Sequence, residues 1–132
     1  MRRSLWPDSK ELEVDEVLRR PSSDGIVVVA ERDGGGLMGF AEIGLRKFAD
    51  GCHSSPVAYL EGIWVDPDTQ RDGVATALVR RAERWARSVG MVELGSDCEL
   101  HNEASRKFHV AVGFEEVQRS ICFKRDLTQG QS

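Results

Sequence analysis

A single carboxylate interrupts an otherwise apolar segment, YLEGIWV, at residues 59–65. The composition of this segment predicts a β-strand, and Glu61 lies within it. If side chains alternate regularly, Glu61 shares one side of the strand with Tyr59 and Ile63. Partial burial there raises the pKa of a carboxyl group toward the range of a general base. Two other roles stay open for Glu61: an anchor for a cationic ligand, and a structural partner of an arginine.

The segment QRDGVA at residues 70–75 follows this strand and opens a predicted helix. A helix N-terminus attracts anions because its backbone N–H groups are unpaired and its dipole is positive there. Gly73 lets a ligand approach the backbone, Ala75 keeps the surface small, and Arg71 adds a positive charge. The segment therefore predicts a pyrophosphate cradle, although a glycine at a tight strand-to-helix connection explains it equally well. Neither GxxxxGK[ST] nor GxGxxG is present.

The elements that position these residues alternate between strand and helix patterns. In chain order they are a helix over 9–20, a hairpin of strands 25–33 and 37–45, a strand over 58–65, a helix over 73–89, a strand over 91–95, a helix over 102–112 and strands over 114–117 and 119–127. Their expected buried residues are Val74, Leu78, Ala82, Trp85 and Val89 in the long helix, Ala104, Phe108, Ala111 and Val112 in the next, and Val117, Ile121 and Phe123 at the end. This order predicts an α/β fold with a mixed, mostly antiparallel sheet, flanked by helices, that becomes parallel across one βαβ unit.

Length and composition indicate one domain over residues 1–132, with a frayed tail at 126–132. The net charge of -4 disfavours nucleic acid as a partner and suits a cationic substrate. No apolar run approaches the roughly 20 residues of a membrane span, and no signal peptide is evident, so we expect a cytoplasmic protein without a membrane partner. The three cysteines, Cys52, Cys98 and Cys122, lack metal-ligand spacing, so no metal is expected.

The context of QRDGVA resembles a known family. An apolar strand, QxxGxA and the helix ALVRRAERWA resemble the acetyl-CoA-binding motif of the GCN5-related N-acetyltransferase (GNAT) superfamily. The segments LWPD, GCHSSPVAYLEGIWV, ELGSD, NEASRKFHVAVGFEEV and ICFKRDL together look like the aminoglycoside 6'-N-acetyltransferases. The resemblance implies a GNAT-type acyl-CoA N-acyltransferase fold that transfers an acetyl group from acetyl-CoA to the 6'-amine of aminoglycoside antibiotics. It also implies a homodimer.

The resemblance further implies a role for each matching residue. Glu61 would be the catalytic base, and the substrate-binding residues would be Trp6, Glu61 and Asp97. The acetyl-CoA contacts would be the backbone of Ile63, Trp64 and Val65 along the pantetheine arm, the pyrophosphate loop Arg71, Asp72, Gly73, Val74, Ala75 and Thr76, and Asn102 near the pantetheine end. For Asp97 a capping or turn role stays open, and Trp6 either stacks on a sugar or closes a core edge. His109 stands where many members carry a tyrosine, and it either donates a proton or is simply packed.

Several positions depart from the family pattern. The family's first strand is absent or shortened, because only residues 1–4 precede the Leu-Trp-Pro segment. Ser9, Phe48 and Gln118 stand where histidine, tyrosine and glutamate are common. Two alternatives therefore stay open: an acetyltransferase of another small amine or peptide amine, and a catalytically silent acetyl-CoA-binding protein.

Overall fold

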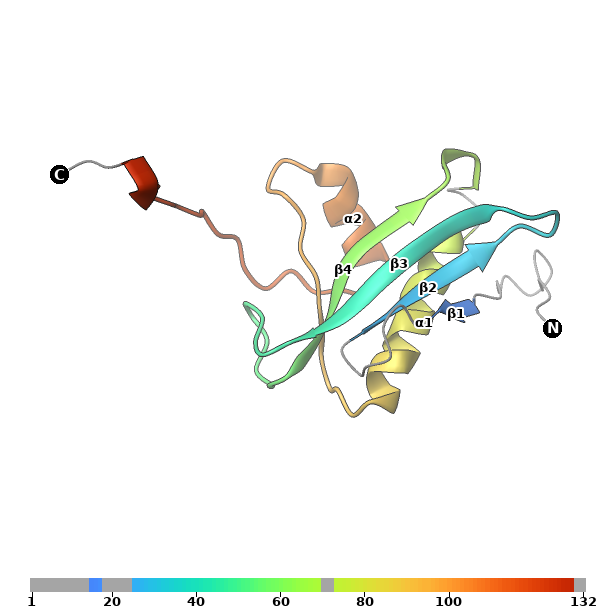
Figure 1. Ribbon diagram of the computed structural model, residues 1–132, viewed down its shortest axis with the longest axis horizontal. Helices are drawn as coiled ribbons and strands as arrows, with labels where there is room; N and C mark the ends of the chain where they lie inside the picture. The colour runs from blue at the N-terminus through green and yellow to red at the C-terminus, as the bar shows by residue number, and fades with distance from the viewer. Residues whose placement is uncertain (1–14, 18–24, 70–72, 130–132) are drawn as a thin grey trace.

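Five strands form one mixed sheet in the computed structural model, which describes residues 15–17, 25–69 and 73–129 (Figure 1). The elements are β1 (Asp15–Val17), β2 (Gly25–Glu31), β3 (Leu37–Arg46), β4 (Val57–Val65), a 3-10 turn (Pro67–Thr69), α1 (Val74–Ser88), β5 (Leu94–Gly95), α2 (Glu103–Ala111) and a 3-10 turn (Leu127–Gln129). The sheet order is β1-β2-β3-β4-β5; the first three pairs are antiparallel and β4–β5 is parallel. The predicted mixed, mostly antiparallel α/β sheet with one βαβ unit is confirmed.

The helix α1 connects β4 to β5 and packs against one face of the sheet, contacting β2, β3 and β4 (Figure 1). The side chains of Val74, Leu78 and Ala82 are 0% exposed, and Trp85 is 8% exposed. This burial confirms the predicted apolar stripe. The backbone turns away from the helix at Gly90, which has a φ of 87°, a left-handed conformation that glycine adopts without strain.

The predicted hairpin of β2 and β3 is also confirmed. Its turn is closed by the backbone N–H of Arg32, which donates to the carbonyl of Gly36 at 2.9 Å. Within β2, Val28 and Ala30 are 0% exposed and belong to the main core beneath α1.

The pairing of β4 with β3 contains a bulge at the glutamate singled out by the sequence. Glu42 of β3 pairs with Gly62, and the next residue, Ile43, pairs with Leu60, so Glu61 has no partner in the β3–β4 register. A bulge of this kind bends the strand and redirects the side chains that follow it.

The bulge shifts the alternation of side chains along β4. Leu60 lies in the main core, and so do Ile63 and Val65, three and five residues later. Tyr59 belongs to a second cluster that does not include them. The prediction that Glu61 shares a side with both Tyr59 and Ile63 is therefore wrong for Ile63. Regular alternation does not survive the extra residue.

The predicted helix over 9–20 is wrong where the structure describes it. Asp15, Glu16 and Val17 form β1 and pair antiparallel with β2; the rest of that range lies outside the described residues. The spacing of Val14, Val17 and Leu18 fits a helix, but the open edge of β2 offers backbone hydrogen bonds, and such tertiary pairing overrides a weak local preference.

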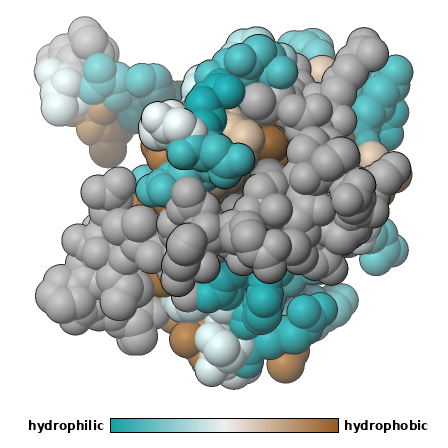
Figure 2. Space-filling model, turned by 90° about the vertical axis from the view of Figure 1, so that its right-hand side faces the viewer, coloured by the Kyte–Doolittle hydropathy of each residue, from teal (hydrophilic) through white to brown (hydrophobic). Residues whose placement is uncertain are grey.

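The C-terminal segment departs most from prediction. Residues 114–126 contain no strand. Phe114 still packs against the core, but the later part of the segment extends away from the body of the molecule (Figures 1 and 2). Ile121 is 75% exposed and Phe123 is 91% exposed. The predicted strands are wrong because alternation alone does not form a strand without a neighbouring edge to pair with. In α2 the expected burial is confirmed only in part, since Ala104 and Ala111 are exposed.

Candidate active site

Two predicted carboxylates are joined through an arginine and a tyrosine. Arg46, the last residue of β3, donates to both carboxylate oxygens of Glu61, from Nη2 at 2.6 Å and from Nε at 3.0 Å. Its Cζ atom lies 3.6 Å from the centroid of the Tyr59 ring. The Tyr59 hydroxyl donates to the carboxylate of Asp97 at 2.5 Å. We call Glu61, Arg46, Tyr59 and Asp97 the carboxylate cluster.

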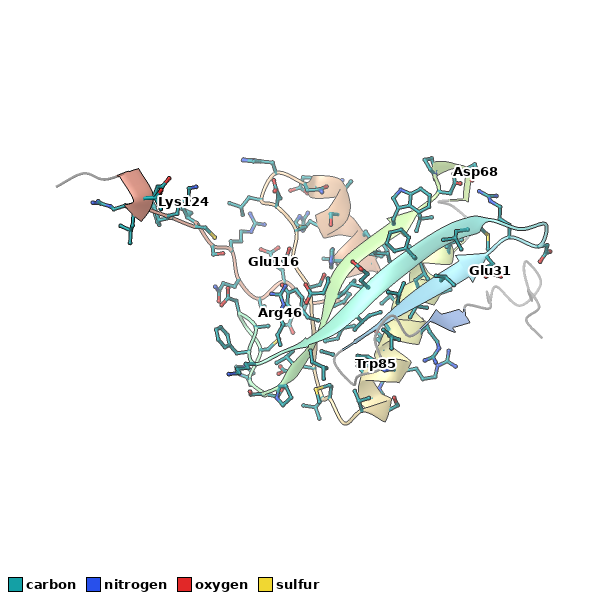
Figure 3. All side chains as sticks on the ribbon, in the orientation of Figure 1. Glu31, Arg46, Asp68, Trp85, Glu116 and Lys124 are labelled. Atoms are coloured by element: carbon teal, nitrogen blue, oxygen red, sulfur yellow. The ribbon has the colours of Figure 1, made fainter. Side chains whose placement is uncertain are left out.

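The ends of three strands bring these side chains together. Tyr59 pairs with Gly44 of β3 on one side and with Gly95 of β5 on the other. Gly95 leaves room for the ring, because a Cβ atom there would lie 3.0 Å from ring carbons of Tyr59. Asp97 follows β5 by two residues and so reaches the Tyr59 hydroxyl. Figure 3 shows Arg46 at the side of the sheet where β3 ends, and Trp85 well apart from it on α1, which lies behind the sheet in this view.

The cluster places one positive side chain, Arg46, and one neutral hydroxyl, Tyr59, between two carboxylates. The pKa of Arg46 is raised, chiefly by its hydrogen bonds to Glu61, so the guanidinium stays charged. The pKa of Tyr59 is raised well above its usual value, first by burial and then by its hydrogen bond to Asp97. Tyr59 therefore remains a neutral donor at physiological pH. Both carboxylates are exposed and therefore accessible from solvent.

One edge of β4 is open beside Glu61. The strand β5 pairs only with Ala58 and Tyr59 of β4 among the described residues. The Asp66 N–H donates to Met38 of β3 at 2.7 Å. Because hydrogen-bonding direction alternates along an antiparallel strand, the N–H and C=O groups of Ile63 and Val65 point to the opposite, open edge. An extended amide-bearing chain fits such an edge.

The N-terminus of α1 follows shortly after this edge. Gly73 is exposed, has a φ of 81° and makes no side-chain cap. The first intrahelical bond runs from Ala77 to the Gly73 carbonyl, so the N–H groups of Val74, Ala75 and Thr76 have no partner within the helix. The Val74 side chain is buried in the core, so only its backbone faces a ligand. This geometry fits a phosphate group.

Three predicted site residues, Trp6, Arg71 and Asp72, lie outside the described residues. Asn102 is exposed and caps α2, its side-chain oxygen accepting from the Ser105 N–H at 3.0 Å.

His109 is a packed residue in this structure. Its Nδ1 lies 2.7 Å from the Ser105 carbonyl and therefore donates to it, and its Nε2 lies 2.8 Å from the Ser96 hydroxyl. Its ring makes edge contacts with Phe108 and Phe114.

The sequence reasoning missed two members of the cluster, Arg46 and Tyr59. A signal existed for Tyr59, which precedes Glu61 by two residues on the same strand. The signal for Arg46 required the β3–β4 register, since Arg46 pairs opposite Val57.

Within the described ranges, no group of three or more His, Cys, Asp and Glu side chains is placed to hold a metal ion. The part of the chain that the structure describes holds no helix suited to crossing a membrane.

Fold and cluster together define a class of protein: an α/β domain with an exposed carboxylate cluster beside an open strand edge and a helix N-terminus. Comparison with known proteins gives the family. The sequence model of the acetyltransferase (GNAT) family matches residues 1–114. The chain belongs to the GNAT acetyltransferase family.

Similar proteins narrow the comparison. An aminoglycoside N(6')-acetyltransferase type 1 from Klebsiella aerogenes is 42% identical over 132 residues, covering 96% of this chain and 87% of that protein. The crystal structure of aminoglycoside 6'-N-acetyltransferase AAC(6')-Ih from Acinetobacter baumannii has a TM-score of 0.77 at 35% identity, covering 81% of this chain and 74% of that one. AAC(6')-Iy in complex with the bisubstrate analogue CoA-S-monomethyl-acetylneamine has a TM-score of 0.76 at 38% identity, covering 80% and 71%. The predicted GNAT-type fold is thus confirmed.

Proposed function

We propose that the protein transfers the acetyl group of acetyl-CoA to the 6'-amine of aminoglycosides. The observation that carries this proposal is the position of Glu61 at the bulge where β4 separates from β5. There a carboxylate meets the open strand edge suited to the pantetheine arm. The relatives with the same fold are named for this reaction, and one is bound to a CoA–neamine analogue.

The protein's own residues supply three functions. Glu61 holds the substrate ammonium and accepts its proton, directly or through a water, so that the neutral amine attacks the thioester carbonyl. A carbon–nitrogen bond forms and the carbon–sulfur bond breaks; the nitrogen then loses a second proton to solvent, and the departing thiolate takes up a proton from solvent. The backbone of Ile63, Trp64 and Val65 binds the pantetheine arm and orients the thioester.

The pyrophosphate is assigned to the N-terminus of α1. Gly73, Val74, Ala75 and Thr76 would bind it there with their backbone N–H groups, together with Arg71 and Asp72. Asn102, whose exposed side chain starts α2, would contact the pantetheine end.

Asp97 is proposed to bind a second ammonium group of the drug. Its exposed carboxylate already accepts a hydrogen bond from Tyr59 and retains further lone pairs. An aminoglycoside carries several ammonium groups, so two carboxylates linked through one cluster suit it better than a monoamine. Trp6 would contact the sugar rings.

The direct test is acetyl-CoA-dependent thiol release with a panel of amines. The panel contains aminoglycosides with a 6'-amine, one with a 6'-hydroxyl instead, spermidine and a lysine peptide. We expect turnover only with the 6'-amine drugs, and mass spectrometry should place the acetyl group on that nitrogen. Turnover with spermidine or the peptide alone would establish the alternative amine. Binding of acetyl-CoA without any turnover would establish a silent binding protein.

We further propose a homodimer in which residues 118–128 of each copy pack on the other. Apolar side chains on this segment are exposed, including Ile121, Phe123 and Leu127 at 75%, 91% and 85%. Beside the short strand β5 lies a pocket of about 450 Å³. Its lining includes apolar residues, among them Ala86, Met91, Val92, Leu94 and Phe114. A second copy of the segment fits this pocket and edge by β-augmentation.

Light scattering after size exclusion tests the dimer. The full chain should elute with twice the monomer mass, and a Phe123→Glu variant should shift to the monomer. A monomeric full chain at tens of micromolar would contradict the proposal.

Three free cysteines, of which Cys98 and Cys122 are exposed, suit the reducing cytoplasm, and we propose that the protein acts there.

A further inference from the structure

The carboxylate assigned to the substrate amine is already occupied by a cation of the protein. Arg46 uses two nitrogens to bind both oxygens of Glu61, and its guanidinium lies over the Tyr59 ring. These are the two interactions that a substrate ammonium would make at this point: a charged hydrogen bond to a carboxylate and a contact with an aromatic face. Asp97 lies at the far end of the same ring.

The Arg46 side chain can move away from Glu61 into solvent. It belongs to the last residue of β3 and is 42% exposed, so its long side chain can turn into solvent. An exposed ion pair is only weakly favourable in water. No described buried side-chain N or O atom depends on it as a partner, since Glu61 and Asp97 are exposed themselves. When a substrate ammonium replaces Arg46, one cation is exchanged for another at Glu61, and no buried charge is left unpaired.

We propose that Arg46 is a resident cation that occupies the ammonium position at Glu61 and Tyr59 in the free protein and is displaced when the substrate binds. This proposal rests on the proposed function of Glu61. It makes Arg46 a specificity-determining residue. A monoamine gains little by replacing a guanidinium, whereas a polyamine that also reaches Asp97 gains an additional ion pair.

Displacement also couples binding to proton transfer. While Arg46 is bound, both carboxylate oxygens of Glu61 accept hydrogen bonds from its guanidinium, so they contact no substrate nitrogen. Once the substrate has taken its place, the proton to be removed lies on the cation that Glu61 now contacts.

The test compares Arg46→Gln with wild type by calorimetric titration of a 6'-amine aminoglycoside. Removing the resident cation should lower the dissociation constant by about 3- to 10-fold, the range of one exposed ion pair plus one cation–π contact. The KM for the drug should fall in parallel, and kcat should stay near the wild-type value. Arg46→Lys, which keeps a cation there, should fall between the two. Arg106→Gln is the matched control, because it removes an exposed ion pair with Glu103 elsewhere on the molecule.

A second probe is methylguanidinium, a small copy of the displaced group. It should inhibit Arg46→Gln competitively against the drug and inhibit the wild type much less. If Arg46→Gln binds the drug with unchanged or weaker affinity, or if its kcat falls while KM rises, Arg46 is a positioning residue and the displacement proposal is overturned. Failure of the proposed function is distinguishable, since wild type and both variants would then show no drug turnover at all.

Discussion

The two halves of β4, on either side of Glu61, differ in burial and in hydrogen bonding. Before Glu61, the residues from Val57 to Leu60 are at most 7% exposed, and two of them pair with β5 as well as β3. After it, Trp64 is 45% exposed, and this half pairs only with β3 among the described residues. One strand therefore contains a rigid half and an open half.

The difference teaches how one strand can hold the carboxylate proposed as the catalytic base and also leave an edge for the proposed ligand. Pairing with both β3 and β5 fixes the backbone at Ala58 and Tyr59, so the cluster around Tyr59 has a rigid base. At the bulge the alternation of side chains shifts by one residue, so Ile63 and Val65 lie in the core. Beyond the bulge, one row of backbone N–H and C=O groups has no strand partner among the described residues. Glu61 lies at the boundary and can contact both an anchored amine and a chain bound along the open edge.

The largest expected effect comes from the boundary residue itself. Glu61→Gln keeps the shape of the side chain but removes its charge and its basicity. We expect kcat/KM for a 6'-amine drug to fall by about 100-fold or more, as for loss of a general base. The fall should lie mainly in kcat, measured by thiol release under saturating acetyl-CoA. Glu83→Gln on α1 is the control and should behave as wild type; an unchanged kcat in Glu61→Gln would leave Glu61 only as an anchor.

Truncation in the two halves of β4 should act on different properties. Leu60→Ala removes a side chain that is 3% exposed in the core, and we expect it to lower the free energy of unfolding by about 2–5 kcal/mol. Trp64→Ala removes an exposed ring stacked on Phe40 and should cost clearly less stability. Urea denaturation measures both. Equal losses would show that the open half is as rigid as the buried one and would break the comparison.

Sequence patterns predicted the rigid part of this molecule well. The stripe from Val74 to Trp85 repeats over about three turns, and Gly90 marks the end of α1, so local signals and burial agree. The hairpin of β2 and β3 carries its own turn glycines. These elements are specified by residues close together in the sequence.

The remaining features depend on contacts distant in sequence. The bulge at Glu61 arises from the β3 register, which no local pattern in YLEGIWV reveals. Arg46 reaches Glu61 only because that register places it opposite Val57 at the start of β4, from where its long side chain extends to Glu61. Val17 fits a helix or a strand, and the edge of β2 decides between them. Along 114–127 apolar residues alternate as in a strand, but these residues pair with no strand in the described part of the chain, and the predicted strands are wrong.

A smaller effect is expected where β4 and β5 still pair. Gly95→Ala places a methyl group 3.0 Å from the ring carbons of Tyr59 and 3.4 Å from Ala49. The ring must shift, so we expect a loss of about 1–3 kcal/mol in the free energy of unfolding. The shift of the ring also moves the Tyr59 hydroxyl away from Asp97. We therefore expect KM for the drug to rise while KM for acetyl-CoA stays unchanged. Thermal denaturation and steady-state kinetics measure the two effects. A variant as stable as wild type, with both KM values intact, would show that the rigid half tolerates displacement of Tyr59.

The smallest expected effect is a pH-dependent one at the loop that leads into the rigid half. One oxygen of Glu93 accepts from the Ser54 hydroxyl at 2.6 Å and from the N–H groups of Ser54 and His53 at 2.8 Å each. These bonds, the Ser54 hydroxyl first, lower the pKa of Glu93. A carboxyl group whose pKa is lowered by folding contributes stability above its unfolded pKa of about 4.3, and that contribution is lost as the pH falls through the folded value.

Glu93→Gln should therefore be less stable than wild type at pH 7, and the difference in the free energy of unfolding should narrow below about pH 4. Urea denaturation at a series of pH values measures it, and Glu99→Gln, an exposed carboxylate beyond β5, should show no such narrowing gap. A gap for Glu93→Gln that stays constant with pH would mean that the loop is tied to β5 by shape alone.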